Sequence, residues 1–154
     1  LVEQGYVAEG VTLYVGYQIL SKEGASSYQG PLKVNYYGRK VPPSVHGTGK
    51  LGRPTASLSR ITEAVLKLYD KLVDRELQVR RMSIAAIRLS PASEVPPQLS
   101  LFASQQDDER ETALMKASIG LHKRFGKNSL VRGMDLLEAG TTWERNDQIG
   151  GHRR

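Results

Sequence analysis

Hydrophobic residues near the start of the chain alternate with small or polar ones. The alternating hydrophobic set is Val11, Leu13, Val15 and Tyr17. A period of two with β-branched and aromatic residues is typical of a strand that buries one face. Before this strand, Gly5 is a stop signal for a helical turn over residues 1–5. The pattern therefore predicts a helical turn followed by a half-buried strand.

Residues 18–43 show no sustained period and are rich in Ser, Gly, Tyr and Lys. Such a segment predicts a long loop or a loose hairpin, with residues 34–37 extended. Residues 44–51 predict a second strand, although Gly47 and Gly49 weaken its pattern. Glycines within a strand also allow another backbone to approach closely.

A helical period follows, with apolar residues three or four positions apart. They are Ile61, Val65, Leu68 and Leu72. With Ser57 or Ser59 as the N-cap, we expect an amphipathic helix over about residues 58–74. An apolar run over residues 82–89 predicts the next strand. The order strand, strand, helix, strand predicts an α+β fold for residues 1–90, with a small antiparallel sheet covered by helices.

Two further regions complete the chain. Residues 91–106 predict a linker, because prolines are frequent in its first part. Residues 107–154 predict a C-terminal helix and a mostly irregular tail. The acids at positions 107–109 and the basic pair at 123–124 suit the two ends of a helix dipole. We therefore assign these acids to helix capping and solvation rather than to a two-metal site.

The net charge of +6 is unevenly distributed along the chain. Residues 1–90 carry 13 Lys or Arg and 7 Asp or Glu, whereas residues 91–154 carry 9 of each. Between residues 18 and 53, six cations face a single acid, Glu23. A one-sided basic stretch is the electrostatic footprint of a protein that binds a polyanion, although solvated basic loops share it.

Composition excludes several classes of site. The chain has no cysteine, which excludes disulfides and thiolate metal sites, and its three histidines lack metal-ligand spacing. No apolar run approaches the roughly 20 residues that span a bilayer, and no signal peptide opens the chain. We therefore expect a soluble, cytoplasmic protein with no metal site and no membrane partner. Because the chain begins with Leu1 rather than Met, we also expect it to be cut from a longer protein.

The segment from His46 to Lys50 is similar to a phosphate-binding loop but lacks its pattern. Ser44 stands in place of the first glycine, and Leu51 follows the lysine. The small residues instead allow backbone amides and Lys50 to approach a DNA phosphate backbone, which positions a protein without reading sequence. The expected DNA contacts are Lys33, Arg39, Lys40, His46, Thr48, Lys50 and Arg53.

Tyr36, Tyr37 and Arg39 lie close together in the basic loop. The tyrosines fit stacking and the arginine fits a phosphate contact, but tyrosines that pack against the protein fit equally well. The sequence leaves both interpretations open.

Two motifs and the order of the elements resemble the C-terminal region of bacterial Y-family DNA polymerases, the error-prone enzymes of translesion synthesis. The motifs are GRPT at residues 52–55, before the helix, and RRMSI at residues 80–84, opening the last strand. The resemblance implies the little finger domain, a β-α-β-β-α-β unit that this chain enters at the end of its first helix. The tail also resembles the C-terminal end of one bacterial subgroup of these polymerases, over residues 125–128, 132–133 and 144–152. The segment 18–43 departs from the family by its length.

A further resemblance lies in a pentapeptide just beyond this domain, Gln98, Leu99, Ser100, Leu101 and Phe102. It matches the motif with which bacterial polymerases and repair proteins bind the sliding clamp. Such a match occurs by chance in about one in a few thousand chains of this length. It follows a Pro-rich linker, where an extended peptide can be presented, although an apolar segment that packs back on the sheet would share its composition.

Together these features predict the DNA-binding and clamp-recruiting part of a translesion DNA polymerase that acts in damage tolerance. The resemblance implies that Mg²⁺ and its carboxylate ligands belong to an upstream palm domain, so neither cofactor nor catalysis is expected in these residues. Two alternatives stay open. One is a stand-alone, non-catalytic DNA-binding adaptor recruited to the clamp, and the other is a basic RNA-binding module.

Overall fold

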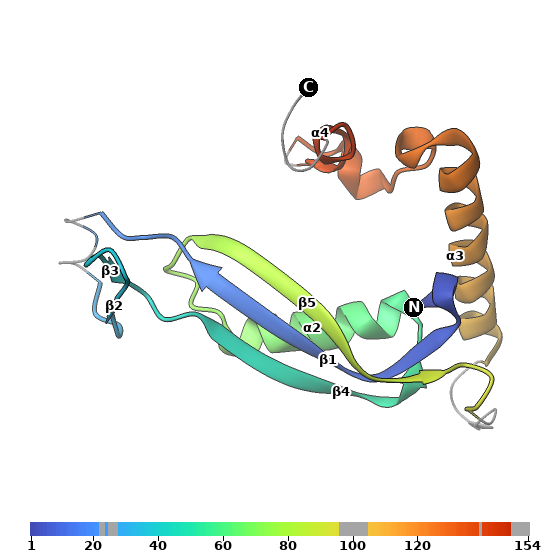
Figure 1. The fold of residues 1–154 in the computed structure, drawn as a ribbon, viewed down its shortest axis with the longest axis horizontal. Helices are drawn as coiled ribbons and strands as arrows, with labels where there is room; N and C mark the ends of the chain where they lie inside the picture. Colours follow the sequence, from blue (N-terminus) through green and yellow to red (C-terminus); the bar gives the residue numbers. More distant parts are fainter. Residues whose placement is uncertain (22–23, 25–27, 96–104, 139, 149–154) are drawn as a thin grey trace. The chain divides into compact units, whose positions relative to one another are not determined.

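The computed structural model describes residues 1–21, 24, 28–95, 105–138 and 140–148. The chain divides into two compact units, Leu1 with Glu3–Gln98 and Val2 with Leu99–Arg154. The first unit contains a three-stranded sheet with one helix, and the second contains a long helix followed by short helical turns (Figure 1). Among the residues described, no helix is long and apolar enough to cross a membrane.

Three antiparallel strands form the sheet of the first unit in the order β4-β1-β5. The central strand β1 spans Tyr6–Tyr17, and its neighbours are β4, Val45–Thr55, and β5, Val79–Pro91. Between β4 and β5 in the chain lies the helix α2, Leu58–Leu72. Ser57, one of the two predicted caps, accepts a backbone N–H of the first turn of α2. This is the α+β fold that the hydrophobic pattern predicted.

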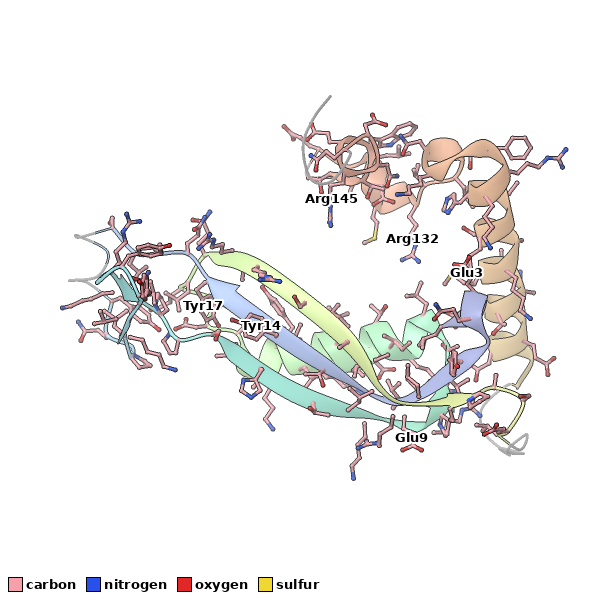
Figure 2. All side chains as sticks on the ribbon, viewed as in Figure 1. Glu3, Glu9, Tyr14, Tyr17, Arg132 and Arg145 are labelled. Carbon is pink, nitrogen blue, oxygen red and sulfur yellow. The ribbon has the colours of Figure 1, made fainter. Side chains whose placement is uncertain are left out.

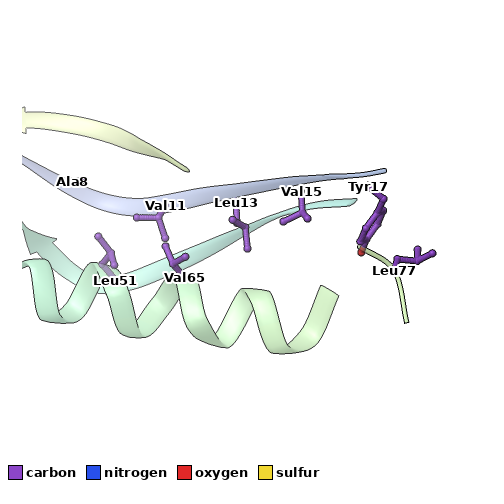
Figure 3. Close-up of a cluster of buried hydrophobic side chains, with 8 residues drawn as sticks. All are labelled: Ala8, Val11, Leu13, Val15, Tyr17, Leu51, Val65 and Leu77. Carbon is purple, nitrogen blue, oxygen red and sulfur yellow. The ribbon is translucent and has the colours of Figure 1, made fainter. Parts of the chain in front are cut away.

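One face of the sheet packs on α2 and forms the core (Figure 3). Val11, Leu13 and Val15 of β1 are fully buried, as their alternation predicted. They meet Leu51 from β4 and Val65 from α2 in one cluster. Burying each Val or Leu side chain contributes about 1.5–3 kcal/mol, so this face holds the unit together.

Gly5 and Gly52 have φ angles of +71° and +79°, a region that side chains disfavour. Gly5 ends a 3-10 turn, η1 over Val2–Gln4, where the sequence predicted a stop. Gly52 lies in an irregularity of β4 between Lys50 and Thr55, which pair with β1 on either side of it. Because this bulge absorbs the extra residues, β4 continues to Thr55, beyond the predicted strand end at residue 51.

A small hairpin interrupts the connection between β1 and β4. Its strands are β2, Lys33–Val34, and β3, Lys40–Val41, which pair antiparallel. A loose hairpin was one of the two predicted forms of this segment. Residues 36–38 form its turn, so the extended stretch predicted over residues 34–37 is wrong for most of its length. Gly38, with a φ of +73°, supplies the backbone conformation that the turn requires.

The second unit begins with α3, Gln105–Phe125, the predicted C-terminal helix. Two 3-10 turns follow, η2 over Lys127–Ser129 and η3 over Gly133–Leu136. A short helix, α4, then spans Thr142–Asn146. The hydrophobic pattern did not predict α4, because five residues are too few to display a helical period.

Side-chain hydrogen bonds connect the short elements of this second unit. Asn146 Nδ2 donates to Asn128 Oδ1 at 2.7 Å, and the Thr142 hydroxyl donates to Asp135 Oδ1 at 2.6 Å. His122 Nε2 donates to a backbone carbonyl of the segment after η2 at 2.8 Å. Short elements held by polar side chains do not produce a periodic pattern of apolar residues. The tail was therefore predicted only as irregular.

Candidate nucleic-acid interface

The face of the sheet opposite α2 is open to solvent. Directly paired residues of an antiparallel sheet point to the same face. Tyr14 lies opposite His46 on one side and Ser83 on the other, and Thr12 lies opposite Thr48. We call this surface the open face, and its side chains are Thr12, Tyr14, His46, Thr48, Lys50, Arg81, Ser83, Ala85 and Ile87.

The two glycines of β4 determine which of its side chains reach the open face. A Cβ atom on Gly47 would lie 2.6 Å from Leu72 Cδ1, and one on Gly49 would lie 3.3 Å from Leu68 Cδ1. Both glycines therefore face α2 and allow the helix to pack close to β4. The approach of a phosphate backbone to the amides of this segment stays a prediction. The residues that alternate with these glycines along β4 are His46, Thr48 and Lys50, and their exposed side chains lie on the open face.

Small and hydroxyl-bearing side chains occupy the middle of the open face. The Thr12 and Thr48 hydroxyl oxygens lie 3.3 Å apart, and Ser83 and Ala85 continue this surface onto β5. Side chains this short leave room for a ligand to approach the backbone of the strands closely. In Figure 2, Tyr14 lies along β1 as one of the larger side chains of this face. Hydroxyl groups there can donate hydrogen bonds to phosphate oxygens.

Positive charge dominates the three strands of this sheet. Their single acid, Glu9 on β1, forms an ion pair with Arg88 on β5, with 3.0 Å between Oε2 and Nε. Because this ion pair neutralises the charge of the only acid, the other cations of the three strands make the local electrostatic potential positive. Those remaining cations are Lys50, Arg53, Arg80 and Arg81.

A groove of about 280 Å³ lies between β4 and α2. Four cations line it, together with one acid, Glu63. Glu63 accepts a hydrogen bond from Lys67 at 2.6 Å, and this bond lowers the pKa of the carboxyl. The net charge of the lining therefore favours an anion. Lys50 belongs to both the groove and the open face, so the two basic surfaces are continuous at that residue.

The structure separates the predicted DNA contacts into two groups, one on β4 and one in the β2–β3 hairpin. His46, Thr48 and Lys50 share the open face. Arg53 is half-buried beside Gly52 in the β4 bulge. The other three lie on the separate β2–β3 hairpin and the turn that closes it; they are Lys33, Arg39 and Lys40.

Six residues of the open face were not among the predicted contacts: Thr12, Tyr14, Arg81, Ser83, Ala85 and Ile87. Their signal was present in the alternation of β1 and β5. The buried half of such a pattern predicts the core, and the other half predicts what is displayed on the opposite face. The alternation, however, does not specify which strands lie side by side.

The predicted clamp motif, residues 98–102, lies outside the described residues. Within the part of the chain that is described, no three His, Cys, Asp or Glu side chains are grouped so as to hold a metal ion. The described surface therefore offers a ligand positive charge and hydroxyl groups.

Comparison with known proteins adds an independent line of evidence. Residues 1–101 match the family model of the impB/mucB/samB family C-terminal domain. Over 103 residues, 67% of this chain and 24% of the relative, the chain is 36% identical to DNA polymerase IV 2 of Bacillus subtilis (strain 168). Over 122 residues, 79% of this chain and 28% of the relative, it is 25% identical to the putative UV-damage repair protein UvrX of the same strain. The chain thus spans about a quarter of the length of these curated relatives. No solved structure matches.

Proposed function

Since this chain belongs to the impB/mucB/samB C-terminal domain family, the C-terminal part of Y-family DNA polymerases, we propose that its open face binds duplex DNA. The observation that carries the proposal is the composition of the open face, which combines hydroxyl side chains with the cations Lys50 and Arg81 and has no acid among its nine side chains. Short hydroxyl side chains and cations suit contacts to phosphates, which hold a duplex without reading its sequence. The binding is therefore sequence-independent and weakens steeply with salt, because phosphate contacts release counterions.

The role that we propose is that of a gripping domain within a translesion polymerase, working on DNA in the bacterial cytoplasm. Nucleotide incorporation and its Mg²⁺ ions fall, in this proposal, to a part of the polymerase outside these 154 residues. These residues then contribute affinity for the primer-template duplex and no catalytic group. Metal-dependent incorporation by the purified chain would contradict this division of labour.

We further propose that residues 98–102 recruit the polymerase to the bacterial sliding clamp. Pro96 and Pro97 precede this pentapeptide, and proline disfavours helix and carries no amide donor. An extended peptide of this kind is suited to bind an apolar pocket through Leu101 and Phe102. Tethering raises the local concentration of a weakly gripping domain near its DNA, so clamp and duplex binding support each other.

A salt titration tests the duplex proposal. Affinity for a fluorescent duplex is measured at several salt concentrations for the wild type, Lys50→Gln and Arg81→Gln. Each change should lower the affinity and reduce the slope of log K against log salt by about 1. The matched control is Lys116→Gln, which removes one charge from an exposed residue of α3 in the second unit.

The control separates specific contacts from diffuse attraction. If Lys116→Gln changes the slope as much as the two open-face variants do, the open-face assignment is wrong. An RNA duplex of the same sequence tests the RNA-binding alternative, which predicts tighter binding to RNA than to DNA. Neither outcome depends on the clamp motif, because the clamp is absent from the titration.

A further inference from the structure

Two tyrosines at the tip of the β2–β3 hairpin are almost entirely exposed. Tyr36 exposes 96% of its surface and Tyr37 exposes 78%, the highest values among the aromatic side chains that the structure describes. Their ring centroids lie 5.4 Å apart with the planes at 86°. This exposure shows that the packing interpretation of these tyrosines, left open by the sequence, is wrong. Aromatic rings of this size are usually buried, so their display calls for a ligand.

The hairpin does not need these rings to hold its shape. Asn35 Oδ1 accepts the backbone N–H groups of Tyr37 and Arg39, both at 3.0 Å. The Asn35 N–H also donates to the Arg39 carbonyl at 2.9 Å, and the Gly38 N–H donates to the Asn35 carbonyl at 3.0 Å. The backbone and one side chain thus close the turn. The rings stand outside this network and are free to contact another molecule.

The hairpin that carries the exposed rings is also basic. Residues 33–41 contain Lys33, Arg39 and Lys40 and no acid. Among the residues described, none of these three cations forms an ion pair with a carboxylate. Exposed aromatic rings beside unpaired cations are the combination that binds single strands of nucleic acid, since the cations attract phosphates while bases stack on the rings.

We propose that Tyr36 and Tyr37 form a stacking site for unpaired bases of single-stranded DNA. The bases of a duplex are already stacked on each other, so a stacking site adds affinity only where a base is unpaired. The choice of DNA over RNA rests on the proposed function, because the duplex that the open face would bind is DNA. A single strand that continues from this duplex is then the ligand for the hairpin.

The test uses the full 154-residue chain and three labelled ligands: a blunt duplex, the same duplex with a single-stranded overhang, and the single strand alone. The double variant Tyr36→Ala, Tyr37→Ala should lower the affinity for the overhang and single-strand ligands by about 5- to 150-fold. Its affinity for the blunt duplex should stay within about two-fold of wild type. Circular dichroism checks that the double variant remains folded.

Two controls distinguish stacking from other effects. The double variant Tyr36→Phe, Tyr37→Phe keeps both rings and should bind the overhang nearly as the wild type does. Phe125→Ala removes an exposed aromatic ring from α3, 61% exposed, and should leave the affinity for all three ligands unchanged.

Several results would overturn the proposal. If the alanine variant loses affinity equally for blunt and overhang duplexes, or for neither, the tyrosines do not stack on unpaired bases. Tighter binding of an RNA overhang than of the DNA overhang would assign the site to RNA. Failure of the open face is distinguishable, because blunt-duplex binding would then be absent in the wild type while tyrosine-dependent single-strand binding remained.

Discussion

The Tyr28 hydroxyl donates a hydrogen bond of 2.9 Å to Asp74 Oδ2, which ties the long β1–β4 connection to the segment that follows α2. The Asp74 N–H in turn donates to the Tyr17 hydroxyl at the end of β1, at 3.0 Å. Tyr28 also packs against the hydrophobic core. These contacts hold the connection on the folded unit at Tyr28, a few residues before the hairpin that displays Tyr36.

The Tyr28–Asp74 bond should have a measurable effect on stability. Tyr28→Phe keeps the ring but removes the hydroxyl, so we expect the free energy of unfolding to fall by about 1 kcal/mol. Urea denaturation followed by circular dichroism measures this change. Tyr6→Phe, at a tyrosine on the first position of β1, is the matched control and should shift stability by less than about 0.5 kcal/mol.

The same bond predicts a dependence on alkaline pH. Burial, followed by the hydrogen bond to Asp74, raises the pKa of Tyr28 above its ordinary value. Because the folded state holds this proton more tightly than the unfolded state, the stabilisation is complete below the ordinary tyrosine pKa of about 10 and is lost as pH rises further. The stability advantage of the wild type over Tyr28→Phe should therefore shrink above pH 10. An advantage that grows there would contradict the assignment.

Two glycines should respond to alanine in opposite directions. A Cβ on Gly10 would lie 2.9 Å from the Gly49 carbonyl oxygen and 3.2 Å from Ile87 Cγ1, so Gly10→Ala must push two strands apart. We expect a loss of about 1–3 kcal/mol in urea denaturation. Gly120 lies in α3 with nothing within 4 Å of the added atom, so Gly120→Ala should stabilise the helix by roughly 1 kcal/mol. Equal effects at both positions would argue against the pairing of β1 with β4.

The second unit should loosen at acidic pH. The hydrogen bond from Thr142, and next the backbone N–H of Arg132, lowers the pKa of the Asp135 carboxyl. A lowered pKa stabilises the fold above the ordinary carboxyl pKa of about 4, and this contribution is lost as pH falls below it. Fluorescence of Trp143, the single tryptophan, should therefore change only in that acidic range.

Removing the Thr142 hydroxyl tests the cause of this acid transition. Thr142→Val should move the fluorescence transition to higher pH, because the Asp135 carboxyl then loses its main stabilising partner. Thr141→Val is the matched control, since the Thr141 side chain makes no cap hydrogen bond to α4. A transition that shifts equally in both variants would mean that Asp135 is not the titrating group.

The clamp motif and the open face should be separable by mutation. Replacing both Leu101 and Phe102 with Ala removes two apolar anchors, each worth roughly 1.5–3 kcal/mol when buried. An interaction in the micromolar range, about −8 kcal/mol, would then become unmeasurable. Titration of this double variant against purified clamp and against blunt duplex should show loss of the first and retention of the second. Retained clamp binding would make the pentapeptide a coincidence, and lost duplex binding would assign it to the folded core.

Local patterns were sufficient to predict β1 and α2, but they did not give the full length of β4 or the turn of the β2–β3 hairpin. The alternation around Leu13 predicted a strand and its buried face, because a strand repeats every two residues whatever lies beside it. The spacing of apolar residues around Val65 predicted α2, because residues three or four positions apart lie on one face of a helix. The charge distribution predicted a polyanion ligand, and the pentapeptide remains a prediction from sequence, since it lies outside the described residues.

Only the tertiary structure decided which residues share a surface. Thr12 and Thr48 are separated by 36 positions in the sequence, and they meet because of the register between β1 and β4. Gly47 faces α2, where an added Cβ would meet Leu72, and the sequence did not specify this neighbour. Tyr36 is displayed because Asn35 closes a turn beneath it. A period in the sequence specifies which side of an element is apolar, whereas the neighbours of the other side depend on contacts between distant segments.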